Sequence, residues 1–204
     1  MSKIKFYKKA DFSNKMEKII NFLKNEEENF WTKKFIKNIS KKMGIKFLGK
    51  GVSAYVFQLS PKKVIRIEFE PSSYGYLKWL KYCIKNQDMK SIPKIHMAFA
   101  LFNDNSCYLI TVSELLIPIK GSKVFKDIHG ASGLIWQFFD EPNAKMVIFE
   151  EIKKNIKVGF QSIIIPQEYV KIKNSMNFLN DLHSENMMLS PDKKRLVITD
   201  PISE

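Results

Sequence analysis

Hydrophobic residues recur at helical spacing in two stretches near the start of the chain. Both stretches lie between residues 11 and 43, and an acidic break at 25–29 separates them. Because spacings of three and four residues place side chains on one face of a helix, we expect two amphipathic helices that brace the strands which follow. Their apolar positions are Met16, Ile19, Ile20 and Leu23, and then Trp31, Phe35, Ile36 and Ile39.

Residues 44–116 follow a different pattern, in which β-branched and aromatic residues form short runs bounded by Gly, Pro and Ser. Such runs are typical of strands joined by turns. One helix, at about 72–86, is expected to interrupt them. The expected strands are two runs within 47–57, a third at 64–69, and two more near 97–102 and 107–112.

The remaining region, residues 117–204, is predicted to be mostly helical, and one helical stripe within it leads straight to Asp181. That stripe consists of Tyr169, Ile172, Met176 and Leu179. Gly-Ser and Glu-Pro-Asn breaks leave residues 120–165 without a clear prediction. We therefore expect an α+β protein in three parts, with a helical brace at 1–43, a β-rich lobe at 44–116 and a short helical lobe from 117 to the end.

Length and composition fit a folded protein of this size. The 204 residues suffice for one domain with a real core or for two small lobes. Hydrophobic residues make up 45% of the chain, but no apolar run approaches the roughly 18 residues that a membrane helix needs, so we expect a soluble protein. No secretory signal is recognised at the start. Cys83 and Cys107 lie in apolar surroundings, which indicates reduced core thiols in a cytosolic protein.

The charge balance is basic. Lys and Arg number 34 against 21 Asp and Glu, which gives a net charge of +13. This balance favours anionic partners such as a nucleotide, a nucleic acid or an acidic protein surface. It is not specific, because lysine-rich composition also follows from an AT-rich genome. No helix-turn-helix, zinc-finger or RNA-recognition pattern is present, so we expect no sequence-specific nucleic-acid binding.

The candidate chemistry concentrates near the end of the chain. Two short apolar runs, 187–189 and 196–199, flank a segment with Pro and Asp where a turn prefers them. If the runs pair as an antiparallel hairpin, Asn186 and Asp200 become neighbours, since opposed backbones lie about 5 Å apart. Their oxygens suit a hard cation such as Mg²⁺. Asp181, just upstream, is then free to accept a proton from a hydroxyl. Residues 181–186 taken alone are equally well interpreted as a polar helix cap and loop.

A second candidate feature lies ahead of it, at the turn between the first two expected strands. Gly49 and Gly51, on either side of Lys50, let a backbone approach phosphates closely. They lead into a strand rather than a helix, so a dinucleotide-binding βαβ unit is disfavoured. On the third strand, Arg66 stands where kinases carry a phosphate-binding lysine. A Gly-x-Gly motif alone more often marks an ordinary hairpin. It supports phosphate binding here only because it precedes the carboxylate residues in sequence.

Along the chain, the glycine turn is followed by the strand with the cation, a helix, two strands, a linker, a helix, Asp181 and Asn186, and the hairpin that ends at Asp200. In this order of elements the chain resembles the protein-kinase-like fold. More narrowly, it is similar to the early serine/threonine protein kinases of podophages of the T-seven type. The Thr-Asp-Pro at 199–201, in place of the usual Asp-Phe-Gly, is the most family-specific piece. The resembling stretches are 29–32, 47–51, 63–66, 108–112, 181–186 and 198–203.

The resemblance implies a compact two-lobed kinase-like fold, with an antiparallel β N-lobe that binds nucleotide and a reduced helical C-lobe. It implies an ATP- and Mg²⁺-dependent enzyme of the host cytoplasm that phosphorylates host proteins on Ser or Thr and redirects host transcription and RNA processing. The implied catalytic residues are Asp181 as base, with Asn186 and Asp200 as the magnesium ligands. The implied ATP-binding residues are Gly49, Lys50 and Gly51 over the phosphates, Arg66 on the phosphates, and Glu114 and Leu116 in the linker whose backbone binds adenine.

Three departures from the kinase pattern leave alternatives open. Arg66 replaces lysine, and a guanidinium fork is not equivalent to an ammonium. The helix at 72–86 has no acidic residue to pair with that cation. On the strand itself, Glu68 is a more plausible partner than Glu70, because it lies two residues from Arg66 on the same face. Only four residues follow Asp200, so peptide recognition is expected from 120–165 or the basic surface. Two alternatives are therefore open. The protein is either a pseudokinase that binds a host protein, or a small-molecule phosphotransferase that resembles aminoglycoside and choline kinases.

Overall fold

The chain forms two compact units, and each draws on two stretches of sequence. In the computed structural model, the first unit combines Met1–Ser72 with Ile95–Leu115, and the second combines Ser73–Lys94 with Leu116–Glu204. The residues that the structure describes are 14–25, 32–51, 53–69, 74–102, 106–118, 166–175, 186–192 and 195–199.

Two helices open the first unit, α1 (Asn14–Lys24) and α2 (Lys33–Met43), and they confirm the two expected amphipathic helices. The Thr32 hydroxyl caps α2 by accepting a hydrogen bond from the Phe35 amide at 3.1 Å. Gly44 ends the helix in the left-handed conformation, with φ 58°. Trp31, expected on the second stripe, lies outside the described residues.

A five-stranded antiparallel sheet forms the rest of the first unit. Its strands are β1 (Lys46–Lys50), β2 (Ala54–Ser60), β3 (Lys63–Phe69), β4 (Ile95–Phe102) and β5 (Cys107–Glu114). They lie in the order β1-β2-β3-β5-β4, so β3 is paired on both sides. The five expected strands are therefore confirmed, and the α+β class with them.

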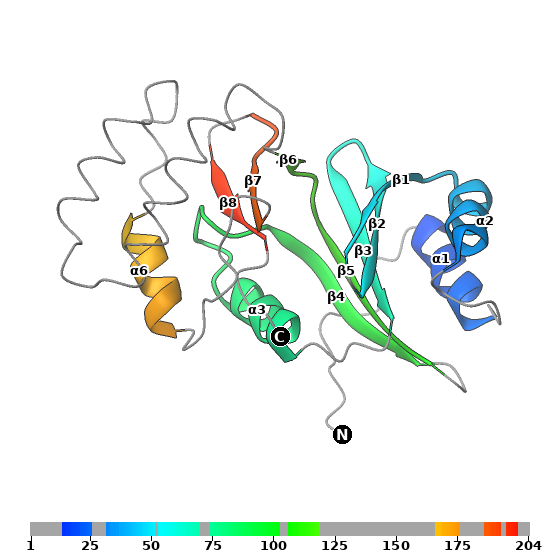
Figure 1. Ribbon diagram of the computed structural model, residues 1–204, viewed down its shortest axis with the longest axis horizontal. Helices are drawn as coiled ribbons and strands as arrows, with labels where there is room; N and C mark the ends of the chain where they lie inside the picture. Colours follow the sequence, from blue (N-terminus) through cyan, green and yellow to red (C-terminus); the bar gives the residue numbers. More distant parts are fainter. Residues whose placement is uncertain are drawn as a thin grey trace. The chain divides into compact units, whose positions relative to one another are not determined.

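The two faces of this sheet have different roles. One face packs against α1 and α2, which lie together beside the sheet (Figure 1). Its buried side chains come from alternate strand positions and include Tyr55, Phe57, Ile65, Ile67, Tyr108, Ile110 and Val112. Because side chains alternate along a strand, Arg66, Glu68 and Thr111 point to the opposite face. The helices α1 and α2 thus cover one face of the sheet, and Arg66 lies on the opposite face.

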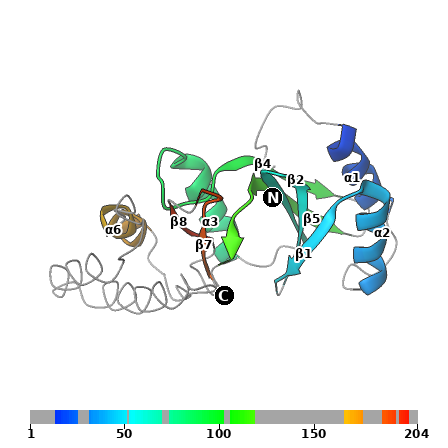
Figure 2. The same ribbon diagram turned by 90° about the horizontal axis from the view of Figure 1, so that it is seen from above.

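The second unit contains α3 (Tyr74–Lys85), α6 (Pro166–Ser175) and a small antiparallel sheet of β6 (Ile117–Pro118), β7 (Met187–Leu189) and β8 (Leu196–Ile198). The predicted hairpin is confirmed, because Met187 pairs with Ile198 and Leu189 with Leu196. The third strand, β6, was not expected. Figures 1 and 2 show α3 beside the hairpin in both views.

Several expectations fall on residues outside the described ranges. They include Met176 and Leu179 of the helical stripe, the whole of 120–165, and Asp181 and Asp200. Among the described residues, no helix has both the length and the apolar character needed to cross a membrane. Cys83 is a buried free thiol, as expected, whereas Cys107, also a free thiol, is partly exposed and not a core residue as expected.

Candidate functional site

The glycine turn and the predicted cation lie in one row across the first sheet. Gly49 on β1 pairs with Val56 on β2, and Val56 pairs with Arg66 on β3. Since neighbouring strands lie about 4.8 Å apart, the backbones of Gly49 and Arg66 are separated by roughly 10 Å. The turn itself is closed by a 2.8 Å hydrogen bond from the Gly51 amide to the Ala54 carbonyl. Sheet register alone therefore brings together the two features that the sequence assigned to phosphate binding.

The two glycines of this turn are not required by packing. A Cβ built on Gly49 or on Gly51 would meet no atom within 4 Å, and neither residue has the left-handed φ that favours glycine. Gly44 differs, because its φ of 58° is strained for any residue with a side chain. The open space beside Gly49 and Gly51 fits the close approach of a ligand to the backbone.

Arg66 is held by a buried carboxylate on its own strand. Its Nη2 lies 3.4 Å from Oε2 of Glu68, and Glu68 is fully buried while Arg66 is 23% exposed. The Ser53 hydroxyl donates to the other oxygen of Glu68 at 3.0 Å. The partner predicted for Arg66 is thus confirmed. Ser53 was missed, because a serine in a turn carries no sequence signal that links it to a strand 15 residues away.

The row continues from Arg66 to Thr111 on β5, which lies directly opposite it. The Thr111 hydroxyl is buried and has no hydrogen-bond partner among the residues that the structure describes. Cross-strand neighbours share a face of the sheet, so this hydroxyl and the guanidinium lie on the same side. A buried polar atom is costly without a partner. The Arg66 face therefore offers both a positive charge and a hydroxyl that a polar ligand would satisfy.

In the second unit, the hairpin sets the position of Asn186. The Thr199 amide donates to the Asn186 carbonyl at 2.8 Å, immediately beyond the first ladder pair of β7 and β8. Asn186 therefore lies opposite the residue that precedes Asp200 in sequence. Asp200 and Asp181 are outside the described residues, so the roles assigned to them remain predictions. Within the described ranges, no three His, Cys, Asp or Glu side chains cluster as a metal site of their own.

The turn of this hairpin is closed by Ser190, which is buried. Its amide donates to the Arg195 carbonyl at 3.0 Å, and its hydroxyl accepts from the Arg195 amide at 3.0 Å. The same hydroxyl is hydrogen-bonded to the Asp192 carboxylate. The Ser-Pro-Asp sequence thus forms the turn that its composition predicted.

The predicted adenine-binding residues lie where the chain passes from one unit to the other. Glu114 is the last residue of β5 and belongs to the first unit, whereas Leu116 belongs to the second. The Leu115 amide between them donates to the Lys62 carbonyl at 2.9 Å, which extends the sheet by one bond. Lys50 is exposed at the end of β1.

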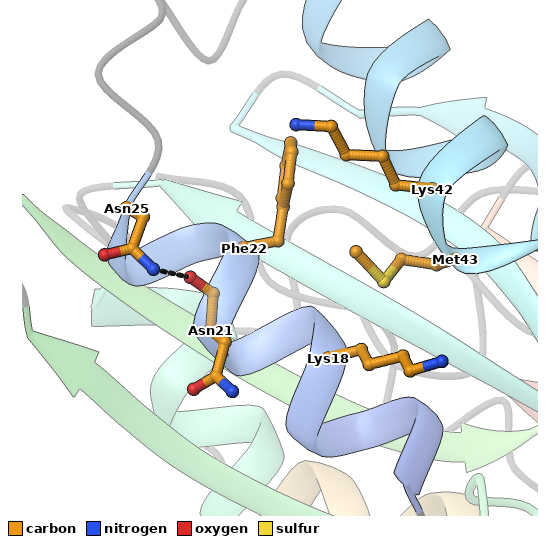
Figure 3. Close-up of a pocket in the computed structure, with 6 residues that line it drawn as sticks. All are labelled: Lys18, Asn21, Phe22, Asn25, Lys42 and Met43. Carbon is orange, nitrogen blue, oxygen red and sulfur yellow. Dashed lines mark hydrogen bonds between the residues drawn. The ribbon is translucent and has the colours of Figure 1, made fainter.

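A separate hollow of about 360 Å³ lies in the helical brace (Figure 3). Lys42 from α2 places its ammonium 4.8 Å from the centre of the Phe22 ring of α1, a cation–π contact. None of the predicted site residues lines this hollow. Its walls are formed by Lys18, Asn21, Phe22, Asn25, Lys42 and Met43.

Comparison with known proteins identifies the family. The model of the family described as bacteriophage T7 protein kinase 0.7 matches residues 13–203, which is nearly the whole chain. No curated protein sequence matches the chain. Among solved structures, a streptomycin–ATP–APH(2")-IIa ternary complex is similar at 12% identity with a TM-score of 0.33, over 85% of this chain and 75% of that chain. On the family match, the chain belongs to the bacteriophage T7 protein kinase family, a family of phosphotransferases.

Proposed function

We propose that this member of the family is an ATP- and magnesium-dependent kinase that phosphorylates host proteins on serine or threonine. The observation that carries the proposal is the 2.8 Å hydrogen bond between the Thr199 amide and the Asn186 carbonyl. It supports a site in which the Asn186 amide oxygen and the Asp200 carboxylate serve one cation. Both are hard oxygen donors of the kind that Mg²⁺ prefers.

The first unit supports the nucleotide part of the proposal. The triphosphate of ATP needs donors and positive charge, and the row from Gly49 to Arg66 offers open backbone beside a fixed guanidinium. Glu68 orients Arg66 toward the face of the sheet that α1 and α2 leave uncovered. Glu68 thereby takes the part that an acidic residue on the helix would otherwise play. The backbone near Glu114 and Leu116 is our proposal for the adenine contact.

The proposed reaction depends mainly on positioning and on electrostatic stabilisation. A substrate hydroxyl attacks the γ-phosphorus of ATP, the bond from that phosphorus to the bridging oxygen breaks, and ADP leaves. Asp181 accepts the hydroxyl proton, and Arg66 offsets negative charge on the phosphates. Magnesium, when bound by Asn186 and Asp200, supplies further neutralisation of that charge.

The proposed substrates are host proteins of transcription and RNA processing. The protein is proposed to act on them in the host cytoplasm. The net charge of +13 supports association with acidic protein surfaces, because opposite charge speeds encounter. Residues 120–165 and the basic surface are the regions proposed to recognise them.

A pseudokinase remains the second candidate, and Arg66 is the residue that favours it. A guanidinium that is already committed to Glu68 has less freedom than a lysine ammonium to follow the phosphates during transfer. The two candidates differ in their response to ligand. ATP with Mg²⁺ should raise the thermal unfolding temperature of a kinase, whereas it should not change that of a protein that only binds a host partner.

The test is transfer of radiolabelled γ-phosphate from ATP into host lysate by the purified protein. The variants are Asp181→Ala and Asp200→Ala, and the matched control is Asp88→Ala, which removes an exposed carboxylate outside the proposed site. We expect magnesium-dependent labelling on serine and threonine, lost by at least about a hundredfold in both variants and kept in the control. Equal labelling by the wild type and both variants contradicts these assignments.

A further inference from the structure

Three backbone groups of Ile198 and Thr199, just before Asp200 in sequence, each have a different hydrogen-bond partner. The Ile198 amide donates to the Ser91 carbonyl at 2.8 Å, and the Thr199 amide donates to the Asn186 carbonyl at 2.8 Å. The Thr199 carbonyl accepts from Nε1 of Trp79 on α3, also at 2.8 Å. A loop, the residue before β7 and a buried tryptophan thus fix the backbone at the end of β8.

The loop that holds Ile198 is itself held by one carboxylate. Glu168 on α6 accepts from the Ser91 amide at 2.8 Å and from the Ser91 hydroxyl at 2.6 Å, both through Oε2. The Lys90 amide donates to both carboxylate oxygens, at 3.1 and 3.0 Å. Ser91 is fully buried. Hydrogen bonds to an ionised acceptor are about twice as strong as neutral ones, so this carboxylate holds the backbone of Lys90 and Ser91 strongly.

The hairpin needs such support because it is small. β7 and β8 have three residues each, and the two-residue β6 adds two paired positions. A sheet of this size is marginal by itself in water. Trp79 is buried and stacks on Tyr82 at 5.7 Å between ring centres, so its indole is held rigidly where it meets Thr199.

We infer that Trp79 and Glu168 are positioning residues, which fix the backbone at the end of β8 and thereby support the magnesium site proposed for Asn186 and Asp200. The inference rests on the proposed function for its catalytic meaning, but the hydrogen bonds stand without it. Residues that orient metal ligands from behind commonly change metal affinity by about tenfold to a hundredfold when they are replaced. Trp79 and Glu168 would act in this way through the backbone of residues 198 and 199.

The first variant is Trp79→Phe, which removes the indole donor and keeps an aromatic ring. Its control is Tyr82→Phe, on the same helix and in the same stack, which removes a hydroxyl bonded to Met89 and to Ser175 rather than to β8. We expect amide hydrogen exchange at Ile198 and Thr199 to quicken about fivefold to tenfold in the first variant and to stay unchanged in the control.

The second variant is Glu168→Gln, which serves if Trp79→Phe fails to fold. The amide keeps the shape of the carboxylate but removes its charge and one acceptor. Its control is Asp88→Asn, which removes one negative charge close in sequence to Lys90 and has no hydrogen bond to that loop among those that the structure describes. We expect faster exchange at Ile198 and Thr199 in Glu168→Gln alone.

The second readout is the magnesium concentration that gives half-maximal phosphate transfer. Positioning predicts about a tenfold increase in Trp79→Phe and Glu168→Gln, with the rate largely restored by excess Mg²⁺. A merely destabilised protein loses active molecules without changing this concentration. Unchanged exchange, or faster exchange with an unchanged magnesium requirement, overturns the inference. If the wild type transfers no phosphate, the proposed function fails, and the exchange measurement alone decides whether these residues hold β8.

Discussion

The two units position their predicted site residues in opposite ways. Arg66 lies in the middle of a seven-residue strand that is paired on both sides, behind which two helices bury a large apolar core. Asn186 directly precedes a three-residue strand, and its neighbour Thr199 is held by single hydrogen bonds from separate elements. Register in a five-stranded sheet fixes the first set of residues, whereas a short hairpin and a few individual hydrogen bonds fix the second. Single substitutions should therefore shift site geometry more readily in the second unit.

The largest effect is expected from the charged pair of Arg66 and Glu68 in the first unit. Glu68→Ala leaves the guanidinium of Arg66 without its buried carboxylate and should lower the free energy of unfolding by about 2 to 3 kcal/mol. This lies at or just below the range for fully buried pairs, because Arg66 is 23% exposed. Glu17→Ala, on an exposed part of α1, is the control and should change stability by less than about 0.5 kcal/mol. Urea unfolding measures both.

A double variant shows whether the cost arises from the pair itself. If it does, Arg66→Ala in the Glu68→Ala background should restore part of the lost stability, since no unpaired charge then remains. If the losses of unfolding free energy in the two single variants simply add in the double variant, Glu68 and Arg66 do not stabilise each other, which would contradict this account.

Two glycines in the first unit provide a comparison of intermediate size. Gly44→Ala should cost about 1 kcal/mol of unfolding free energy, because its φ of 58° disfavours a side chain. Gly51→Ala should leave stability within about 0.5 kcal/mol, because the new methyl group meets no atom within 4 Å. If phosphates approach this turn, the same change should weaken ATP binding about tenfold, as measured by calorimetry. Unchanged ATP affinity would remove the glycine turn from the proposed site.

The smallest effects compare two Ser-Pro turns, one in each unit. Ser190 is buried and hydrogen-bonds both to the Arg195 amide and to Asp192, so Ser190→Ala should cost about 1 kcal/mol. Ser60 accepts one exposed bond of 3.4 Å from the Lys62 amide, and Ser60→Ala should cost less than about 0.5 kcal/mol. Thermal unfolding measures the pair. Equal costs would contradict the claim that the second unit depends more on individual hydrogen bonds.

Local patterns predicted most of the described fold. Alternation and turn residues gave the five strands of the first sheet, helical stripes gave α1 and α2, and the hairpin of β7 and β8 followed from two apolar runs around a turn. Strand alternation also identified Glu68 as the partner of Arg66, because the two are only two residues apart.

The supporting contacts could not be predicted, because they join residues that are distant in sequence. Trp79 contacts Thr199 across 120 positions, and Glu168 contacts Ser91 across 77. In sequence, Trp79 is one apolar residue among several on α3, and Glu168 is an ordinary acid in the first turn of a helix. Neither residue carries a local signal of its partner, and the membership of α3 in the second unit likewise depends on tertiary packing.

The central claim is the proposal that the protein binds ATP with magnesium, using Arg66 for the phosphates and Asp200 for the metal. The most direct measurement is ATP affinity with and without Mg²⁺ for the wild type, Asp200→Asn and Arg66→Gln. We predict that Mg²⁺ tightens ATP binding in the wild type, that Asp200→Asn loses this gain, and that Arg66→Gln binds ATP more weakly under both conditions. A magnesium gain that survives in Asp200→Asn, or ATP binding that is unaffected by Arg66→Gln, would contradict the claim.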